Sequence, residues 1–208
     1  MSPLRYLILP LFFAMLATGQ TIQKKSASSV SGQAETLVRT LYRQVMLRKP
    51  IGTMKPADRK VFAPYLSETL HHEFDSAIAC EADFFRQNPP KPDLPEKPPF
   101  AWLENGTFSG GDEEDELRSF QIERSDAQKD GSIHLHVRLR WGHPPEKPWF
   151  TRVIVVVTRE NGNLVVDDLI YQGEQDQTYT QHLSEVLEMG CRKGHWVGYD
   201  VQEGRPKP

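Results

Sequence analysis

Two adjacent carboxylates, Asp167 and Asp168, have the residue types needed for acid–base chemistry. Carboxylates that act together as acid and base must face the same site. Both residues stand in the apolar stretch Leu164–Tyr171, which is predicted to be a strand, and neighbouring side chains on a strand point to opposite faces. Only one of them can therefore face a given site, and they cannot act as a carboxylate pair.

His134 and His136 lie on one face of a second predicted strand, Ile133–Trp141, and a His-x-His pattern can supply two metal ligands. His71 and His72 add imidazoles elsewhere, but no third ligand follows at a recognisable spacing. A face that is open to solvent, or packed against a second subunit, explains the same histidines. We therefore predict no metal site and no cofactor.

Residues 1–19 predict a signal peptide. Arg5 supplies the positive end, Tyr6–Leu16 is an apolar run, and Ala17–Gly19 are small residues before a cleavage point at Gln20. The apolar run is shorter than the about 20 residues that cross a membrane, and Pro10 interrupts it. We expect a secreted or periplasmic protein with no membrane span after signal cleavage.

Cys80 and Cys191 are the only two cysteines of the chain. An exported protein meets an oxidising compartment, which favours a disulfide between them. The alternative is two separate buried thiols. A catalytic thiol is disfavoured, because no histidine stands beside either cysteine in the sequence and export would oxidise it. We predict the disulfide Cys80–Cys191.

Composition excludes several classes of protein. The 208 residues carry 25 Lys and Arg against 28 Asp and Glu, so the basic excess typical of nucleic-acid binding is absent. Aromatic residues make up 10% of the chain, which is unlike an acidic disordered tail. A mean hydropathy of -0.54 excludes a membrane protein with several spans.

The first half of the chain predicts helices. Residues 20–32 are polar and are expected to be a flexible lead, and an amphipathic helix follows from Gln33 to Lys49. A short helix is expected within Pro56–Pro64, and a longer one, capped by Ser67, to about Arg86. The six prolines of Pro89–Pro99 predict a stiff connector in preference to a proline-rich ligand for a partner domain.

The second half predicts an antiparallel sheet. Strands are expected around Phe120–Glu123 and over Ile133–Trp141, Phe150–Thr158 and Leu164–Tyr171, with turns at Gly131 and Asn161-Gly162. A short helix over Thr180–Met189 and a mobile tail, 200–208, complete the chain. Helices followed by such a meander predict a single α+β domain, 33–199, with N-terminal helices packed on a curved antiparallel sheet.

The helix pair, the proline-rich connector and the strand Leu164–Tyr171 resemble the cone-shaped superfamily named after nuclear transport factor two (NTF2-like). Four stretches are similar to a group of exported bacterial proteins within it, a domain of unknown function: Tyr65–Ser67, Phe100–Glu104, Phe108–Gly110 and Gly194–Tyr199. The resemblance covers Gln33–Tyr199. It implies the fold and a concave pocket, but a fold hosts many activities and does not choose between them.

Enzymes of that superfamily transfer protons with a pocket carboxylate and Tyr or His donors. Carried over to this chain, the resemblance makes Asp168 (or Asp167) the base, with Tyr42, His72 and Tyr171 beside it. We favour the other interpretation, in which the carboxylate accepts hydrogen bonds from a helix end or an arginine and fixes the last strand.

The pocket implied by the resemblance would be lined by aromatic and imidazole side chains: Tyr42, His72, Trp102, Tyr171 and Trp196. For Trp196 we prefer the role of an anchor that closes the core under the disulfide.

We therefore expect a non-catalytic binding or interaction module whose concave apolar pocket takes a small molecule or a segment of a protein partner. One alternative is a small pocket enzyme of the isomerase or dehydratase type that uses Asp168 as base. Another is an inhibitor or immunity-type protein that acts on a secreted partner. The architecture also allows a homodimer through the outer face of the sheet.

Overall fold

The structure is a computed structural model and describes residues 19–89, 105–112, 114–142, 145, 147–172, 180–200 and 205–206. The predicted signal peptide up to Thr18, most of the proline-rich connector and Trp102 lie outside the described residues. Among the helices of the described residues, none is both long and apolar enough to cross a membrane.

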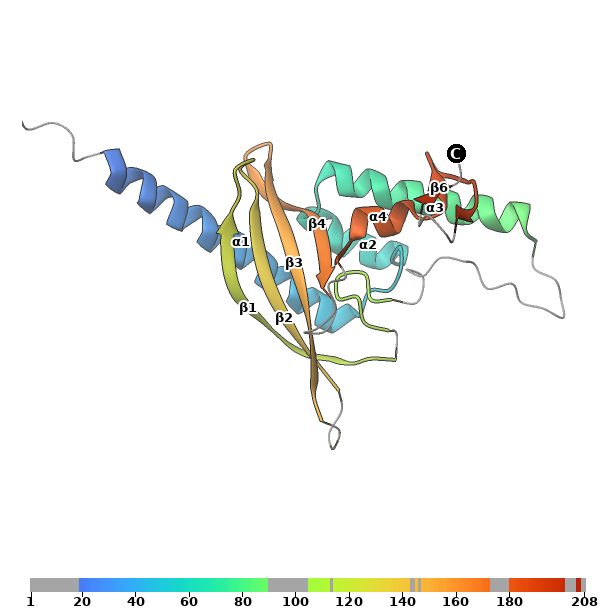
Figure 1. Cartoon of the computed structure of the whole chain (residues 1–208), viewed down its shortest axis with the longest axis horizontal. Coiled ribbons are helices and arrows are strands. Elements are labelled where there is room, and N and C mark those ends of the chain that lie inside the picture. The colour runs from blue at the N-terminus through green and yellow to red at the C-terminus, as the bar shows by residue number, and fades with distance from the viewer. Residues whose placement is uncertain are drawn as a thin grey trace, which may run out of the picture.

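The chain folds as predicted into N-terminal helices followed by a curved antiparallel sheet and a short helix, a cone-like α+β arrangement (Figure 1). The helical elements are α1 (Gly19–Arg48), α2 (Pro56–Phe62), the 3-10 turn η1 (Ala63–Tyr65), α3 (Glu68–Gln87) and α4 (Leu183–Glu188). The main sheet contains β1 (Leu117–Ala127), β2 (Ile133–Trp141), β3 (Trp149–Glu160), β4 (Asn163–Gln172) and β5 (Thr180–His182). Two short ladders close the chain: β6 (Cys191–Arg192) with β7 (His195–Trp196), and β8 (Tyr199–Asp200) with β9 (Arg205–Pro206).

The sheet runs in the order β1-β2-β3-β4-β5, and each pair of neighbours is antiparallel. Strand β2 has the predicted bounds, and every second residue from Ile133 to Trp141 is buried while the residues between are more exposed. The buried side chains face the helices, so this alternation defines the inner face of the sheet. In β3 the run Val153–Val155 is buried without alternation, so both faces of this part of the strand are covered.

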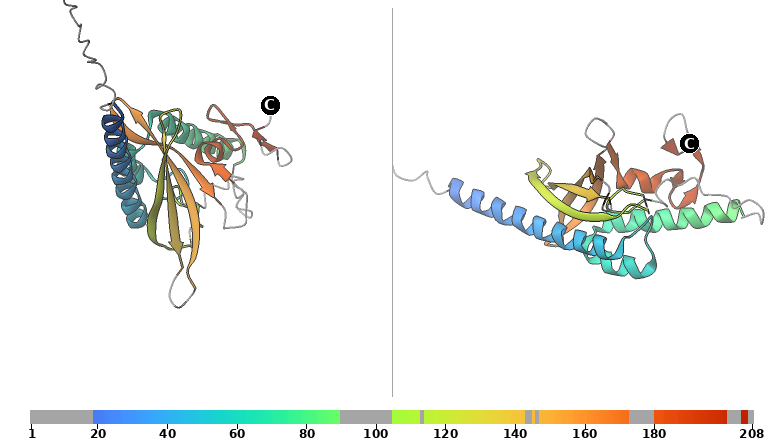
Figure 2. Two further views of the ribbon diagram at one scale, coloured as in Figure 1. Left: turned by 60° about the vertical axis from the view of Figure 1, so that its left-hand side comes forward. Right: turned by 90° about the horizontal axis from the view of Figure 1, so that it is seen from below.

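Helix α1 lies along one face of the sheet and extends beyond it (Figures 1 and 2). It begins at Gly19, so the segment 20–32, predicted as a flexible lead, is helical instead. The residues from Gln20 to Ser31 include no proline and no glycine, so nothing in the backbone prevents a helix there. The prediction was wrong because a segment with few apolar residues can still be helical when it continues a helix that is packed further along the chain.

Helix α3 begins where predicted. The Ser67 hydroxyl accepts a hydrogen bond from Leu70 N at 3.0 Å, the bond of an N-cap. Ser67 N donates to Val166 O at 2.8 Å, and Leu66 and Val166 form a parallel bridge. These bonds attach the start of α3 to β4.

The C-terminal region differs from the prediction in two places. Thr180–His182, expected in the last helix, form strand β5, because β4 offers an edge on which Tyr171 pairs with Gln181. The tail from residue 200, expected to be mobile, contains the β8–β9 pairing of Asp200 with Arg205.

The predicted disulfide Cys80–Cys191 is present, with the two Cα atoms 5.9 Å apart. It joins α3 to β6. Beside it the Trp196 ring packs edge-on against Phe84 at 5.2 Å between centroids, and Trp196 N donates to Asp83 at 2.9 Å. Trp196 therefore holds the β6–β7 ladder on α3, which is the anchoring role preferred from the sequence.

Candidate functional site

A cavity of about 280 Å³ lies where the ends of β3, β4 and β5 meet α4 and a glycine-rich loop. The loop contributes residues between Asn105 and Gly110, and the strands contribute Thr151, Arg152, Tyr171, Gln172 and Gln181. Helix α4 contributes the apolar wall, Leu183, Val186 and Leu187. We call this the rim cavity.

The loop Asn105–Asp112 is compact because glycines allow its backbone to close on itself. Gly106 N donates to Gly111 O at 2.7 Å, and Gly110 N donates to Gly106 O at 2.8 Å. A Cβ atom at Gly106 would stand 2.2 Å from Ser109 Oγ, so a larger residue there would require the Ser109 side chain to rotate away. The Thr107 hydroxyl donates to Gly52 O at 2.8 Å and fixes the loop to the turn after α1.

The same loop fills the interior of the cone. Phe108 is fully buried, with its ring 4.8 Å from that of Phe62. The Tyr42 hydroxyl donates to Phe108 O at 2.9 Å, and the Tyr171 hydroxyl donates to Thr107 O at 2.5 Å. The interior, where the resemblance implied a pocket, is therefore packed, and the rim cavity lies at its edge.

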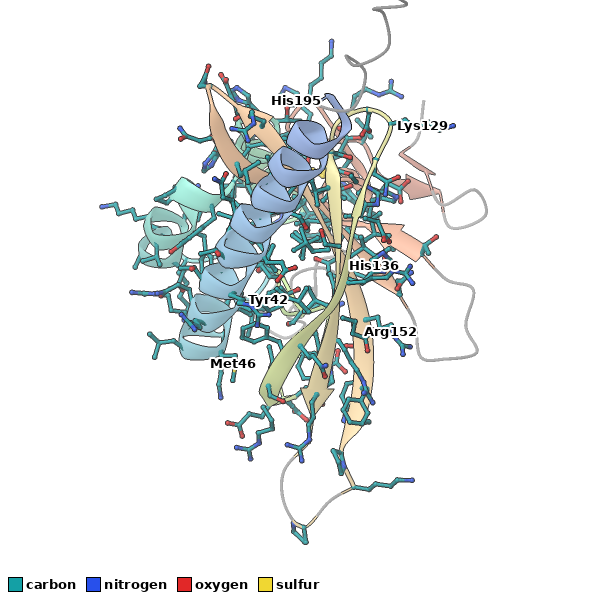
Figure 3. The ribbon with its side chains drawn as sticks, turned by 90° about the vertical axis from the view of Figure 1, so that its left-hand side faces the viewer. Tyr42, Met46, Lys129, His136, Arg152 and His195 are labelled. Carbon is teal, nitrogen blue, oxygen red and sulfur yellow. A yellow bond between two sulfur atoms is a disulfide. The ribbon has the colours of Figure 1, made fainter. Side chains whose placement is uncertain are left out.

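Of the predicted pocket residues, Tyr42 and Tyr171 come near each other, bonded to neighbouring carbonyls of the loop, but His72 and Trp196 lie elsewhere. Tyr171 lines the rim cavity, whereas Tyr42 is a fully buried core residue between α1 and the sheet (Figure 3). His72 lies on the exposed side of α3, with Nε2 3.9 Å from Glu68 Oε1. Trp196 packs on α3 as described above, and Trp102 lies outside the described residues.

Asp168 does not line the rim cavity. Val156 pairs with Asp168 while Val157 pairs with Val166, so Asp167 is the extra residue of a β-bulge. The bulge places Asp168 on the face of β4 opposite to Tyr171.

The carboxylate of Asp168 holds the start of α4. Its Oδ1 accepts hydrogen bonds from Leu169 N at 2.8 Å and Ser184 N at 3.2 Å, and its Oδ2 accepts from His182 Nδ1 at 2.6 Å and Ser184 Oγ at 3.2 Å. This geometry is the helix-end role that we favoured from the sequence, and it leaves no free oxygen directed at the cavity.

Glu73 on α3 is a perturbed carboxyl that the sequence analysis missed. Burial, followed by the negative charges of Asp168, Glu188 and Asp167, raises the pKa of Glu73 to about 7. Its Oε2 is buried and has no hydrogen-bond partner in the described part of the chain. The helical period could have indicated its place, because Glu73 borders the buried stripe of Leu70, Phe74 and Ala77.

Among the described residues that line the rim cavity, two have titratable side chains, Arg152 and Tyr171. Arg152 Nε donates to Glu123 Oε2 at 3.3 Å. Burial raises the pKa of Tyr171 well above its ordinary value, so the phenol stays neutral and its proton stays on the bond to Thr107 O. The described part of the lining therefore has no group that exchanges protons near neutral pH.

The histidines of β2 lie on the outer face of the sheet. His136 and Arg152 appear on the side of the sheet away from α1 (Figure 3). His136 Nε2 is 3.0 Å from Asp126 Oδ2, and burial with the nearby Arg124 cation lowers the pKa of His136. Over the described ranges, no group of three His, Cys, Asp or Glu residues could hold a metal ion.

Comparison of the chain with protein-family models, with curated proteins and with solved structures gave no match. Membership of the NTF2-like superfamily therefore stays a proposal.

Proposed function

We propose that this protein is a non-catalytic binding module and that the rim cavity takes a small uncharged ligand with an apolar body. One observation carries the proposal: the lining joins an apolar wall to neutral hydrogen-bonding groups, and its two titratable side chains are already engaged. The wall is Leu183, Val186 and Leu187, and Gln172 and Gln181 contribute amide side chains.

The size and polarity of the cavity limit the ligand. Ligand pockets are usually about 300–1,000 Å³, so a cavity of about 280 Å³ suits a small molecule or a single side chain of a partner. A charged ligand would need a counter-charge in the lining, because a buried unpaired charge is costly. Among the lining residues that the structure describes, the one charged side chain, Arg152, is paired with Glu123.

The enzyme alternative has less support. A general base must reach the proton that it removes, at hydrogen-bond distance or through one water. Asp168 stands outside the lining, and its oxygens accept four hydrogen bonds from Leu169, His182 and Ser184. Export remains part of our proposal, since a disulfide such as Cys80–Cys191 persists in oxidising compartments.

The first test is native mass spectrometry of the mature protein, purified without reduction from the exported fraction of its host. A co-purifying noncovalent mass would identify the ligand class. The second test measures benzamide binding by isothermal titration calorimetry, because benzamide is small, apolar and uncharged. We expect saturable binding with a Kd of about 1 mM, as is usual for a ligand of this size.

Two variants assign the binding to the rim cavity. Gln181→Trp fills the cavity and should abolish benzamide binding, whereas Gln121→Trp, on an exposed position of β1, should leave it unchanged. The proposal fails if benzamide binds without saturation, or if Gln181→Trp binds it as well as the wild type with an unchanged unfolding midpoint.

A further inference from the structure

A second hollow of about 280 Å³ lies between α2 and α3, and it shares no lining residue with the rim cavity. Helix α2 lies between the end of α1 and α3 (Figures 1 and 2). The floor of the hollow is apolar and includes Met54, Leu66 and Phe74. Its polar side chains are Arg59, Lys60, His71 and Asp75. We call it the α2–α3 groove.

Local backbone contacts fix the walls of the groove. His71 Nε2 donates to Ala63 O at 3.0 Å, which ties the first turns of α3 to η1. Asp58 N and Arg59 N both donate to Lys55 O, so α2 starts at a defined place after the turn that contains Met54. The groove is therefore part of the folded framework and does not depend on a loop.

The charges of the groove are unbalanced towards the positive. Lys60 makes no ion pair within the described ranges, and Asp75 is the one carboxylate among the groove residues. Asp75 Oδ1 lies 3.4 Å from Arg59 Nη1, and the Asp75 side chain is 71% exposed. A contact of this length and exposure contributes little, so it neutralises the groove poorly.

Arg59 keeps one edge of its guanidinium unused. Its Nε is buried and has no hydrogen-bond partner in the part of the chain that the structure describes. Asp75 approaches Nη1, and the opposite edge, formed by Nε and Nη2, is the edge that grips a carboxylate with two parallel hydrogen bonds. Nε has almost no exposed surface, so a ligand reaches this edge only when the guanidinium turns towards the groove. A buried donor without an acceptor is unfavourable, which favours such a turn when a ligand supplies the acceptors.

We propose that the α2–α3 groove is a second binding site, for a small carboxylate carried on an apolar body. The carboxylate accepts from Nε and Nη2 of Arg59, Lys60 adds a second positive charge, and the apolar body lies on Met54, Leu66 and Phe74. The rim cavity, whose only cation is paired with Glu123, has the opposite preference for an uncharged ligand.

The test compares benzoate with benzamide, which have nearly the same shape and differ in charge. Each is titrated into ¹⁵N-labelled full-length mature protein, with detection of the backbone amides and of the arginine Nε–Hε signals. Benzoate should shift the Arg59 Nε–Hε signal and the amides of His71 and Phe74 in a saturable manner. Benzamide should bind there about tenfold more weakly, because it lacks the charge-assisted bonds.

A variant separates the guanidinium geometry from charge alone. Arg59→Lys keeps the positive charge but loses the planar guanidinium with its two parallel donors. It should weaken benzoate binding about tenfold. Arg39→Lys, which changes an exposed arginine of α1, is the matched control and should bind benzoate like the wild type.

Three results would overturn the proposal: no saturable shift of the Arg59 signal, equal binding of benzoate and benzamide in the groove, or equal effects of the two Arg→Lys changes. The first two need only the wild-type protein, so they hold even if Arg59→Lys unfolds. Benzoate shifts confined to Tyr171 and Gln181 would assign its binding to the rim cavity and also refute the groove.

Discussion

Replacing Glu73 by Gln should stabilise the protein at alkaline pH and leave its stability nearly unchanged at acid pH. The Glu73 carboxyl is half-buried, and burial with the charges of Asp168, Glu188 and Asp167 raises its pKa from 4.5 to about 7. In the unfolded chain the carboxyl loses its proton near pH 4.5, whereas the folded protein retains it until about pH 7. The folded state therefore loses stability as the pH rises through this window.

The magnitude follows from the two pKa values. For a fully buried carboxyl, a pKa of about 7 in place of 4.5 would lower the free energy of unfolding by about 3 kcal/mol above pH 7. Solvent screens a carboxyl that is half-exposed, so we reduce the expected cost to about 1–2 kcal/mol. Glutamine resembles the protonated acid and does not ionise, so Glu73→Gln should recover this amount at high pH only.

Urea unfolding of the wild type and of Glu73→Gln at about pH 3.5, below the unfolded pKa, and at about pH 8.5 measures the effect. The gain from the substitution should be near zero at the lower pH and about 1–2 kcal/mol at the higher. Glu35→Gln, on an exposed position of α1, is the control and should show no such dependence on pH. If the gain from Glu73→Gln is the same at both pH values, the carboxyl titrates normally and the electrostatic account of this site is wrong.

Four further predictions concern stability. Replacing both Cys80 and Cys191 by Ala should lower the free energy of unfolding by about 3–5 kcal/mol, given a sequence separation of 111 residues, and reducing agent should destabilise only the wild type. Gly111→Ala should cost about 1–3 kcal/mol in urea unfolding, because its Cβ would stand 2.4 Å from an indole ring of β2. Gly32→Ala, where nothing lies within 4 Å inside α1, should instead stabilise by about 0.5–1 kcal/mol. Asp168→Asn should lower the thermal midpoint, at a cost of about 1–2 kcal/mol, without weakening benzamide binding; a loss of binding with an unchanged midpoint would restore Asp168 as a site residue.

The parts of the fold that the sequence predicted are those fixed by local patterns. Strand β2 has the predicted bounds because its side chains alternate strictly between apolar and polar. The Asn161-Gly162 turn between β3 and β4 takes positive φ at both residues, as expected for a tight hairpin. The Ser67 cap depends on residues within one turn of helix.

The parts that were missed depend on contacts between distant segments. Strand β5 has only three residues, and it is a strand because the edge of β4 accepts it, not because Thr180–His182 favour extended backbone. The raised pKa of Glu73 requires β4 and α4 to meet α3, which no spacing along the chain reveals. The α2–α3 groove likewise exists only after His71 is bonded to Ala63.

The position of the candidate site follows from one residue of the glycine-rich loop. Phe108 fills the interior of the cone, and the closed loop brings the carbonyls of Phe108 and Thr107 to the hydroxyls of Tyr42 and Tyr171. Both phenols thus donate to backbone, and burial raises both of their pKa values, so neither is available to donate to a substrate. Within the cone, space for a ligand is then left at the rim, where Gln181 and the α4 wall supply hydrogen bonds and apolar surface and the described lining residues supply no acid or base. This loop closure is why binding, and not proton transfer, is the chemistry that we propose for the cavity.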